Sequence, residues 1–150
     1  MNEQVKELAG IVIAVVLIMD ALIHAYWATG QIWPARNKLS LTQAVLNSSK
    51  TQSFRPAILV TLVCLLFCGA LIVLARVHLL GTPGQLIPDP LLQVGILAIA
   101  AGLLLRGIAG VVWAMGLAAS QSKLFYKLNL LIYTPTCLIL FIAALLAAGF

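Results

Sequence analysis

Two ionisable side chains, Asp20 and His24, lie four residues apart in a segment that is otherwise apolar enough to cross a lipid bilayer. A spacing of four residues places both side chains on one face of a helix. A charge at the bilayer centre costs at least about 2.5–3.5 kcal/mol, so an ionisable residue inside a span is a candidate for ligand binding or proton transfer. Since His is the side chain that titrates near neutral pH, the pair predicts acid–base chemistry or a buried polar contact.

A third ionisable residue, Arg106, lies in the third apolar segment with Gly102 and Gly110 one helical turn away on either side. Membrane helices place small residues where neighbouring helices approach closely, so we expect Arg106 to face the protein interior. Asp20 and Arg106 both fall near the midpoints of their segments, offset by only ~2–3 Å at ~1.5 Å per residue. The sequence therefore predicts an ion pair between Asp20 and Arg106 at the centre of the membrane.

The same counting predicts a second polar layer. It places His24 and Tyr133 at a common depth, ~7 Å nearer one membrane surface than the midpoint. The candidate ligand site consists of the polar side chains of both layers, namely Asp20, His24, Arg106 and Tyr133. Secondary candidates share the same depths or faces, and they are Trp27, Cys64, Cys68 and Trp113.

The elements that must position these residues are membrane-spanning helices. Hydrophobic residues make up 63% of the chain, charged residues 9%, and the mean hydropathy is +1.10. Soluble domains are about half apolar and about a quarter charged. Residues 8–30, 56–80, 91–119 and 128–150 each supply the ~20 apolar residues that a span requires. We predict an all-α membrane protein, a four-transmembrane-helix bundle with short loops that forms a single domain over residues 1–150. The first segment is interpreted as a retained helix, not a cleaved signal peptide, because no small-residue cleavage site follows it.

Each segment has one face that gathers small or polar residues at a spacing near 3.5, as expected for helix packing in lipid. These faces are predicted to point inward. They consist of Gly10, Ile13, Leu17, Asp20, His24 and Trp27; of Ala57, Thr61, Cys64, Cys68, Leu71, Ala75 and His78; of Gly95, Ala98, Gly102, Arg106, Ala109, Trp113 and Gly116; and of Tyr126, Asn129, Tyr133, Thr136, Leu140, Ala144 and Ala147.

The loops predict an orientation. Residues 31–55 and 120–127 carry basic side chains and no acid, whereas the opposite side carries most of the acids. The positive-inside rule then places these two loops in the cytoplasm and both termini outside a cell inner (plasma) membrane. Within the first loop, Ser40 and Gln43 fit a capping box, which predicts a short interfacial helix.

Other chemistries find little support. Cys64 and Cys68 are four residues apart on one helix, a poor geometry for a disulfide, and are interpreted as small packing residues, with a redox pair or soft-metal site as the alternative. The chain has no CxxC and no HExxH motif, so we predict neither a cofactor nor a metal. The formal charge of +5 is spread over short loops, which favours a topological signal over nucleic-acid binding.

Two motifs carry a family resemblance. The stretch "IHAYWATGQIWP" contains His24, Tyr26, Trp27, Gly30, Trp33 and Pro34, and "YTPTC" covers Tyr133 to Cys137. With these motifs the chain resembles small four-helix bacterial membrane proteins known only as a domain of unknown function (3995). The resemblance implies the fold over nearly the whole length and implies no activity.

Three functions remain open for the buried polar residues. The first is binding of a small ligand or handling of protons. The second is that of a non-enzymatic partner of another membrane protein, such as an assembly factor or an immunity protein against a membrane-targeting toxin. The third, an enzyme acting on a lipid-soluble substrate with His24 as acid–base, is supported by no other catalytic motif. In a purely structural interpretation, the ion pair would only fix the register of the helices.

Overall fold

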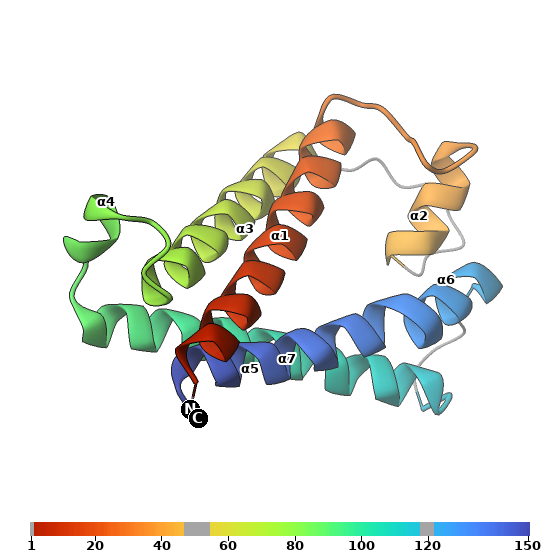
Figure 1. Cartoon of the computed structure of the whole chain (residues 1–150). Helices are drawn as coiled ribbons and strands as arrows, with labels where there is room; N and C mark the ends of the chain where they lie inside the picture. Colours follow the sequence, from red (N-terminus) through yellow and green to blue (C-terminus); the bar gives the residue numbers. More distant parts are fainter. Residues whose placement is uncertain (1, 47–54, 118–121) are drawn as a thin grey trace.

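The computed structural model describes residues 2–46, 55–117 and 122–150, and its regular elements are helices (Figure 1). Their bounds are α1 Glu3–Ala28, α2 Lys38–Leu46, α3 Pro56–Arg76, α4 Thr82–Gln85, α5 Asp89–Ala114, α6 Lys123–Leu128, the π-helix η1 Asn129–Tyr133, and α7 Thr134–Ala148. The described residues contain no strand.

Among the described residues, four helical stretches are long and apolar enough to cross a membrane: Glu3–Ala28, Pro56–Arg76, Asp89–Ala114 and the continuous stretch Lys123–Ala148. The predicted fold class, an all-α chain with four candidate membrane spans, is confirmed. The boundaries differ from the predicted ones. The first span begins earlier because Asn2 accepts a hydrogen bond from the Gln4 amide (3.1 Å) and caps the helix. Residues 118 and 119, the end of the predicted third segment, lie outside the described residues, as do residues 120 and 121 of the predicted loop 120–127.

The spans form two helix pairs, α1 with α3 and α5 with α7 (Figure 1). The pairs pack against each other near the chain termini, through contacts of α1 with α7 and of α3 with α5, and diverge toward α2 and α6. Each span supplies at least one fully buried side chain to the core at this junction, such as Ile13, Val73, Ile96 and Ala144. Glycine permits close approach here, since a Cβ atom at Gly95 would lie only 2.7 Å from Ile72 Cγ2.

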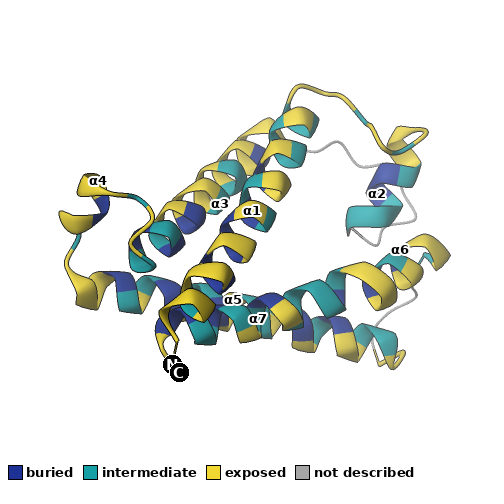
Figure 2. Cartoon of the chain, in the orientation of Figure 1, coloured by how far each residue is buried: buried dark blue, intermediate teal, exposed yellow. Residues whose placement is uncertain are grey.

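The outer faces of the spans carry large apolar side chains such as Leu65, Leu105 and Ile139, which are more than half exposed (Figure 2). Such surfaces suit contact with lipid.

The predicted inward faces are only partly correct. On α1, Gly10, Ile13 and Leu17 are buried, and on the last span Asn129, Leu140, Ala144 and Ala147 are buried, as predicted. On α3 only Ala75 of the predicted face is buried: Cys64, Cys68 and Leu71 are exposed, while the buried residues include Gly69, Ala70 and Val73.

The faces were misassigned because α3 is apolar on every side, so polarity does not distinguish them. Its smallest residues, Gly69 and Ala70, form the contact, and the cysteines lie beside them. On α5 the predicted face is also wrong at Ala98 and Gly102, which are exposed, whereas Ile96 and Ala100 are buried.

The helix predicted in the first loop is present as α2. Its cap is Asn37, whose side chain accepts from the Ser40 amide (2.8 Å), so the predicted Ser40 cap is wrong by one turn. Two hydrogen bonds hold α2 on the last span: Ser122 Oγ donates to the Gln43 carbonyl (3.0 Å), and the Tyr133 hydroxyl donates to the Ala44 carbonyl (3.3 Å).

The last span is interrupted by the π-helical turn η1, in which the Thr134 amide donates to the carbonyl of Asn129, five residues back. Pro135 follows Thr134 in the sequence. Proline has no amide hydrogen and its ring clashes with the carbonyl four residues before it, so a regular α-helix is disfavoured here. A π-turn is a common way for a helix to absorb such a disruption, and it occurs often at functional sites.

Candidate functional site

Arg106 of α5 is surrounded by neutral groups. Its Nη1 atom donates a long hydrogen bond of 3.4 Å to Asn129 Oδ1. Its guanidinium carbon lies 5.1 Å from the centre of the Trp113 ring and 5.7 Å from that of the Tyr133 ring. Aromatic faces attract a cation at such distances by about 0.5–2 kcal/mol. Arg106 is thus held in position by an amide and two aromatic rings.

Asn129 is the central hydrogen-bonding residue of this cluster, and its side chain is fully buried. Its Nδ2 donates to the Gly110 carbonyl at 2.7 Å, while its Oδ1 also accepts from Thr134 Oγ1 at 3.2 Å. Gly110 makes the arrangement possible, because a Cβ atom there would clash with Thr134 Oγ1 and lie 3.1 Å from Asn129 Oδ1. Asn129 and Thr134 were not predicted as site residues. The sequence signal that could have indicated them is the presence of two polar side chains shortly before the proline of an apolar span.

Asp20 and His24 form a second cluster on α1. His24 Nδ1 lies 2.8 Å from the Asp20 carbonyl oxygen and 3.2 Å from its carboxylate Oδ1. The His24 side chain is 13% exposed and that of Asp20 is 50% exposed, so the imidazole is the better protected group. Trp27 packs edge-on against His24 with ring centres 5.0 Å apart, and its Nε1 donates to the Trp33 carbonyl at 2.8 Å.

The predicted Asp20–Arg106 ion pair is wrong. Within the described residues Arg106 makes no ion pair, and Asp20 contacts His24. Counting along the sequence gives Asp20 and Arg106 similar depths, but α1 and α5 belong to different helix pairs, which diverge at this end (Figure 1). Equal depth therefore did not make the two residues neighbours.

The clusters nevertheless flank the same part of the last span. The charges of Asp20 and Arg106 both lie within electrostatic range of Tyr133 and Cys137. We call the side chains of Asp20, His24, Arg106, Asn129 and Tyr133 the polar region. The secondary candidates Trp27 and Trp113 lie beside it, in contact with His24 and Arg106 respectively. Cys64 and Cys68 do not, because both are exposed on α3, and their assignment to the polar layers is wrong.

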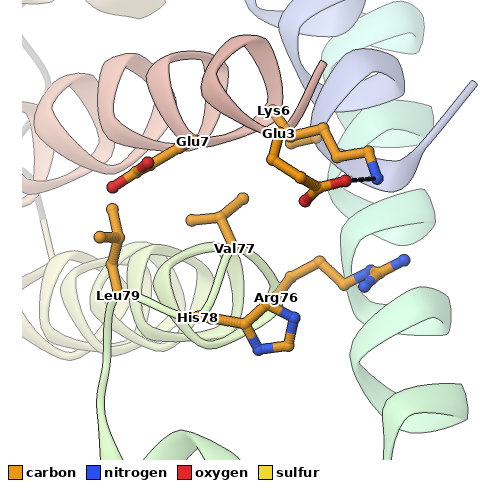
Figure 3. Close-up of a pocket in the computed structure, with 8 residues that line it drawn as sticks. Glu3, Lys6, Glu7, Arg76, Val77, His78 and Leu79 are labelled. Carbon is orange, nitrogen blue, oxygen red and sulfur yellow. Dashed lines mark hydrogen bonds and ion pairs between the residues drawn. The ribbon is translucent and has the colours of Figure 1, made fainter. Parts of the chain in front are cut away.

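A cavity of ≈ 490 Å³ lies at the other end of the molecule, where α1 begins and α3 ends (Figure 3). It was not predicted, and it is lined by Glu3, Lys6, Glu7, Arg76, Val77, His78, Leu79 and Ala147. Lys6 pairs with Glu3 at 2.6 Å. The Arg76 guanidinium points away from Glu7 and donates to Gln93 Oε1 (3.0 Å) and to the Ala148 carbonyl (3.3 Å).

His78 lines this cavity with an unusual backbone conformation, φ = 60°. Its amide donates to the Ala75 carbonyl and the Leu79 amide to the Leu74 carbonyl, which is the Schellman arrangement that ends a helix. Glycine is the usual residue at this position. In the described part of the chain, no group of three or more His, Cys, Asp or Glu side chains is placed to hold a metal ion.

Comparison with known proteins places the chain in a family. The family model described as "Protein of unknown function (DUF3995)" matches residues 17–144, a range that includes every residue of the polar region. No curated protein and no solved structure matches the chain. The family predicted from the two sequence motifs is thereby confirmed, and the chain belongs to the DUF3995 family of proteins of unknown function.

Proposed function

We propose that this protein is a multi-pass protein of the plasma (inner) membrane that binds a small ligand in the polar region. The observation that carries the proposal is the convergence of Arg106, Asn129 and Tyr133 inside apolar spans. They come from two different spans and meet at a π-helical turn.

The chemistry of the region favours binding over a purely structural role. Polar groups inside a bilayer are costly and are therefore rare unless they serve a function. A few convergent polar groups in apolar surroundings are the usual composition of a small-molecule site. The region supplies a fixed cation in Arg106, a hydroxyl in Tyr133 and a protected imidazole in His24.

We further propose that loops 31–55 and 120–127 face the cytoplasm, with both termini outside. The basic residues of these loops support this orientation. The polar region then lies in the cytoplasmic half of the membrane, beneath α2. A reporter active only in the cytoplasm, fused after Phe150, should stay inactive, and activity of that fusion would reverse the orientation.

The ligand-binding proposal is tested by the small molecules that the purified protein retains. Wild-type protein and the variants Asn129→Leu and Arg106→Gln would be purified in mild detergent, matched for monodisperse folded protein, and extracted with organic solvent for mass spectrometry. The control is Tyr126→Phe, an exposed tyrosine on the same span. A retained compound that is present in wild type and Tyr126→Phe but depleted in both site variants supports the proposal. Identical extracts from all four proteins would contradict it.

Proton handling and the binding of another membrane protein stay predictions. Asp20 and His24 form the only acid–imidazole pair among the described salt bridges, so proton transfer would depend on them. Replacing His24 with Phe should then change the pH profile of proton uptake by reconstituted vesicles. An unchanged profile would remove proton handling from the roles open to the polar region.

A further inference from the structure

Arg106 has no carboxylate of the protein to neutralise it. The chain has four acidic side chains, and all of them lie in the described residues. Glu3 pairs with Lys6, Asp20 contacts His24, and Glu7 lines the cavity at the opposite end. Asp89 begins α5, and the rise of ~1.5 Å per residue puts it ~25 Å along the helix from Arg106. Arg106 therefore forms no ion pair with any of these side chains, and its guanidinium is a cation in a membrane-spanning helix without a carboxylate in contact.

Neutral partners offset only part of the cost of that charge. A guanidinium stays protonated in proteins. A hydrogen bond to a charged group contributes about 1.5–3 kcal/mol, and an aromatic face contributes about 0.5–2 kcal/mol. These contacts orient the group without cancelling its charge. An anion supplied from outside the chain would cancel it.

Within the described residues, no hydrogen bond engages the Nε and Nη2 atoms of the guanidinium. The hydrogen bond to Asn129 uses Nη1. The Nε and Nη2 atoms form the second edge, and two parallel N–H groups match the two oxygens of a carboxylate. Trp113 and Tyr133, which contact the guanidinium through their rings, and Asn129 hold this fork in a fixed orientation.

We propose that Arg106 binds the carboxylate of a lipid-soluble monocarboxylic acid, such as a long-chain fatty acid, with its apolar tail among the spans. This inference rests on the proposed ligand-binding function and names the ligand class. The single positive charge of Arg106 matches the single negative charge of a monocarboxylate. Arg106 also lies eight residues before the end of α5 at Ala114, ~12 Å along the helix axis, which is deeper than a phospholipid headgroup lies. A carboxylate on an apolar chain suits that depth.

The fluorescence of Trp113 can report binding at Arg106, because its ring contacts the Arg106 guanidinium. Tryptophan fluorescence of the whole protein in nanodiscs would be titrated with dibrominated stearic acid, whose bromines quench nearby indoles. The matching dibrominated alcohol and alkyl phosphate are the comparison probes. We expect saturable quenching by the acid with at least tenfold higher affinity than by either comparison probe. The saturable component should disappear in Trp113→Phe.

Variants at the cation complete the test. Arg106→Gln should weaken binding of the acid at least tenfold, and Arg106→Lys should weaken it less. Arg55→Gln removes an exposed arginine at the start of α3 and should change nothing. If Arg106→Gln does not fold, competition in wild type decides: unbrominated stearic acid should displace the probe, and stearyl alcohol should not.

Other outcomes separate the two proposals. Equal binding of acid and alcohol, or unchanged binding in Arg106→Gln, overturns the carboxylate inference and leaves small-ligand binding standing. Preference for the phosphate probe overturns the carboxylate assignment in favour of a phosphate ligand. Absence of saturable quenching by any probe also overturns it, while the retained-molecule experiment decides the proposed function independently.

Discussion

The guanidinium of Arg106 and the side-chain amide of Asn129 are joined by a hydrogen bond of 3.4 Å between two spans, across 23 residues of sequence. Asn129 in turn donates to the Gly110 carbonyl, one helical turn beyond Arg106. The charge is thus tied to the backbone of its own helix through a residue of another helix. This relationship replaces the ion pair expected from the sequence and changes what mutations at these positions should do.

Exchanging the charges of Asp20 and Arg106 should not restore folding. The single variants Asp20→Arg and Arg106→Asp each place a new charge in the spans, so both should lower folded yield. Asp20 contacts His24 and not Arg106. The double variant should therefore yield no more folded protein than the single variant with the lower folded yield. Fluorescence-detected size exclusion of tagged protein measures this. Recovery in the double variant would mean that the two residues do pair.

Adding one methyl group at Gly110 should be far more costly than adding one at Gly102 of the same helix. A Cβ at Gly110 would clash with Thr134 Oγ1, whereas nothing lies within 4 Å of a Cβ at Gly102. Gly110→Ala should reduce stability by about 1–3 kcal/mol. Gly102→Ala should be neutral or stabilising by up to about 1 kcal/mol through helix propensity. Unfolding titrations in mixed micelles compare the two, and equal effects would contradict the close contact.

Removing the Tyr133 hydroxyl should loosen α2. Tyr133→Phe deletes the hydrogen bond to the Ala44 carbonyl, a contribution of about 0.5–1.5 kcal/mol, and keeps the ring against Arg106. Hydrogen–deuterium exchange should rise in residues 38–45 and stay constant in α1 and α5. The matched control, Tyr126→Phe on the same span, should leave exchange in α2 unchanged. A rise in both variants would show that α2 does not depend on this bond.

Relief of backbone strain is expected at His78. Its φ of 60° lies in the left-handed region, where a side chain costs about 1 kcal/mol or more. His78→Gly should therefore raise thermal stability. His78→Ala removes the same imidazole but keeps a Cβ, so it should give no such gain. If both variants gain equally, the imidazole and not the backbone is the source of the effect.

The sequence predicted the features that depend on local hydropathy. It did not predict which faces of the helices contact one another. The four spans follow from the length of each apolar run, and the inward face of α1 follows from Gly10, Ile13 and Leu17. The face of α3 could not be predicted, because lipid is as apolar as the helix and does not select a side. The prediction placed Cys64 and Cys68 on the inward face of α3, whereas the residues buried against the other helices are Gly69 and Ala70.

The candidate site was predicted in part for a similar reason. Depth along a span can be counted from the sequence, and the count placed Arg106 in one layer with Asp20 and Tyr133 in the other with His24. In the structure it is Arg106 and Tyr133 that meet. Which spans are neighbours at that depth depends on the divergence of the two helix pairs, which no residue count reveals. Asn129 was placed on the inward face but not among the site residues, because its role depends on a π-turn that only the three-dimensional backbone makes visible.

The π-turn η1 divides the last span into two helical segments, α6 and α7. The rotation of α6 about the helix axis is set independently of the rotation of α7. A π-turn accommodates one extra residue, and one residue corresponds to about 100° of rotation in an α-helix. Deleting a single residue between Asn129 and Tyr133 would leave the α7 contacts with α5 in place and swing Phe125 and Ser122 away from the neighbours that they now contact. Homologues in which this segment differs in length by one residue should therefore share the same packed core but carry α6 in a different rotation about the helix axis.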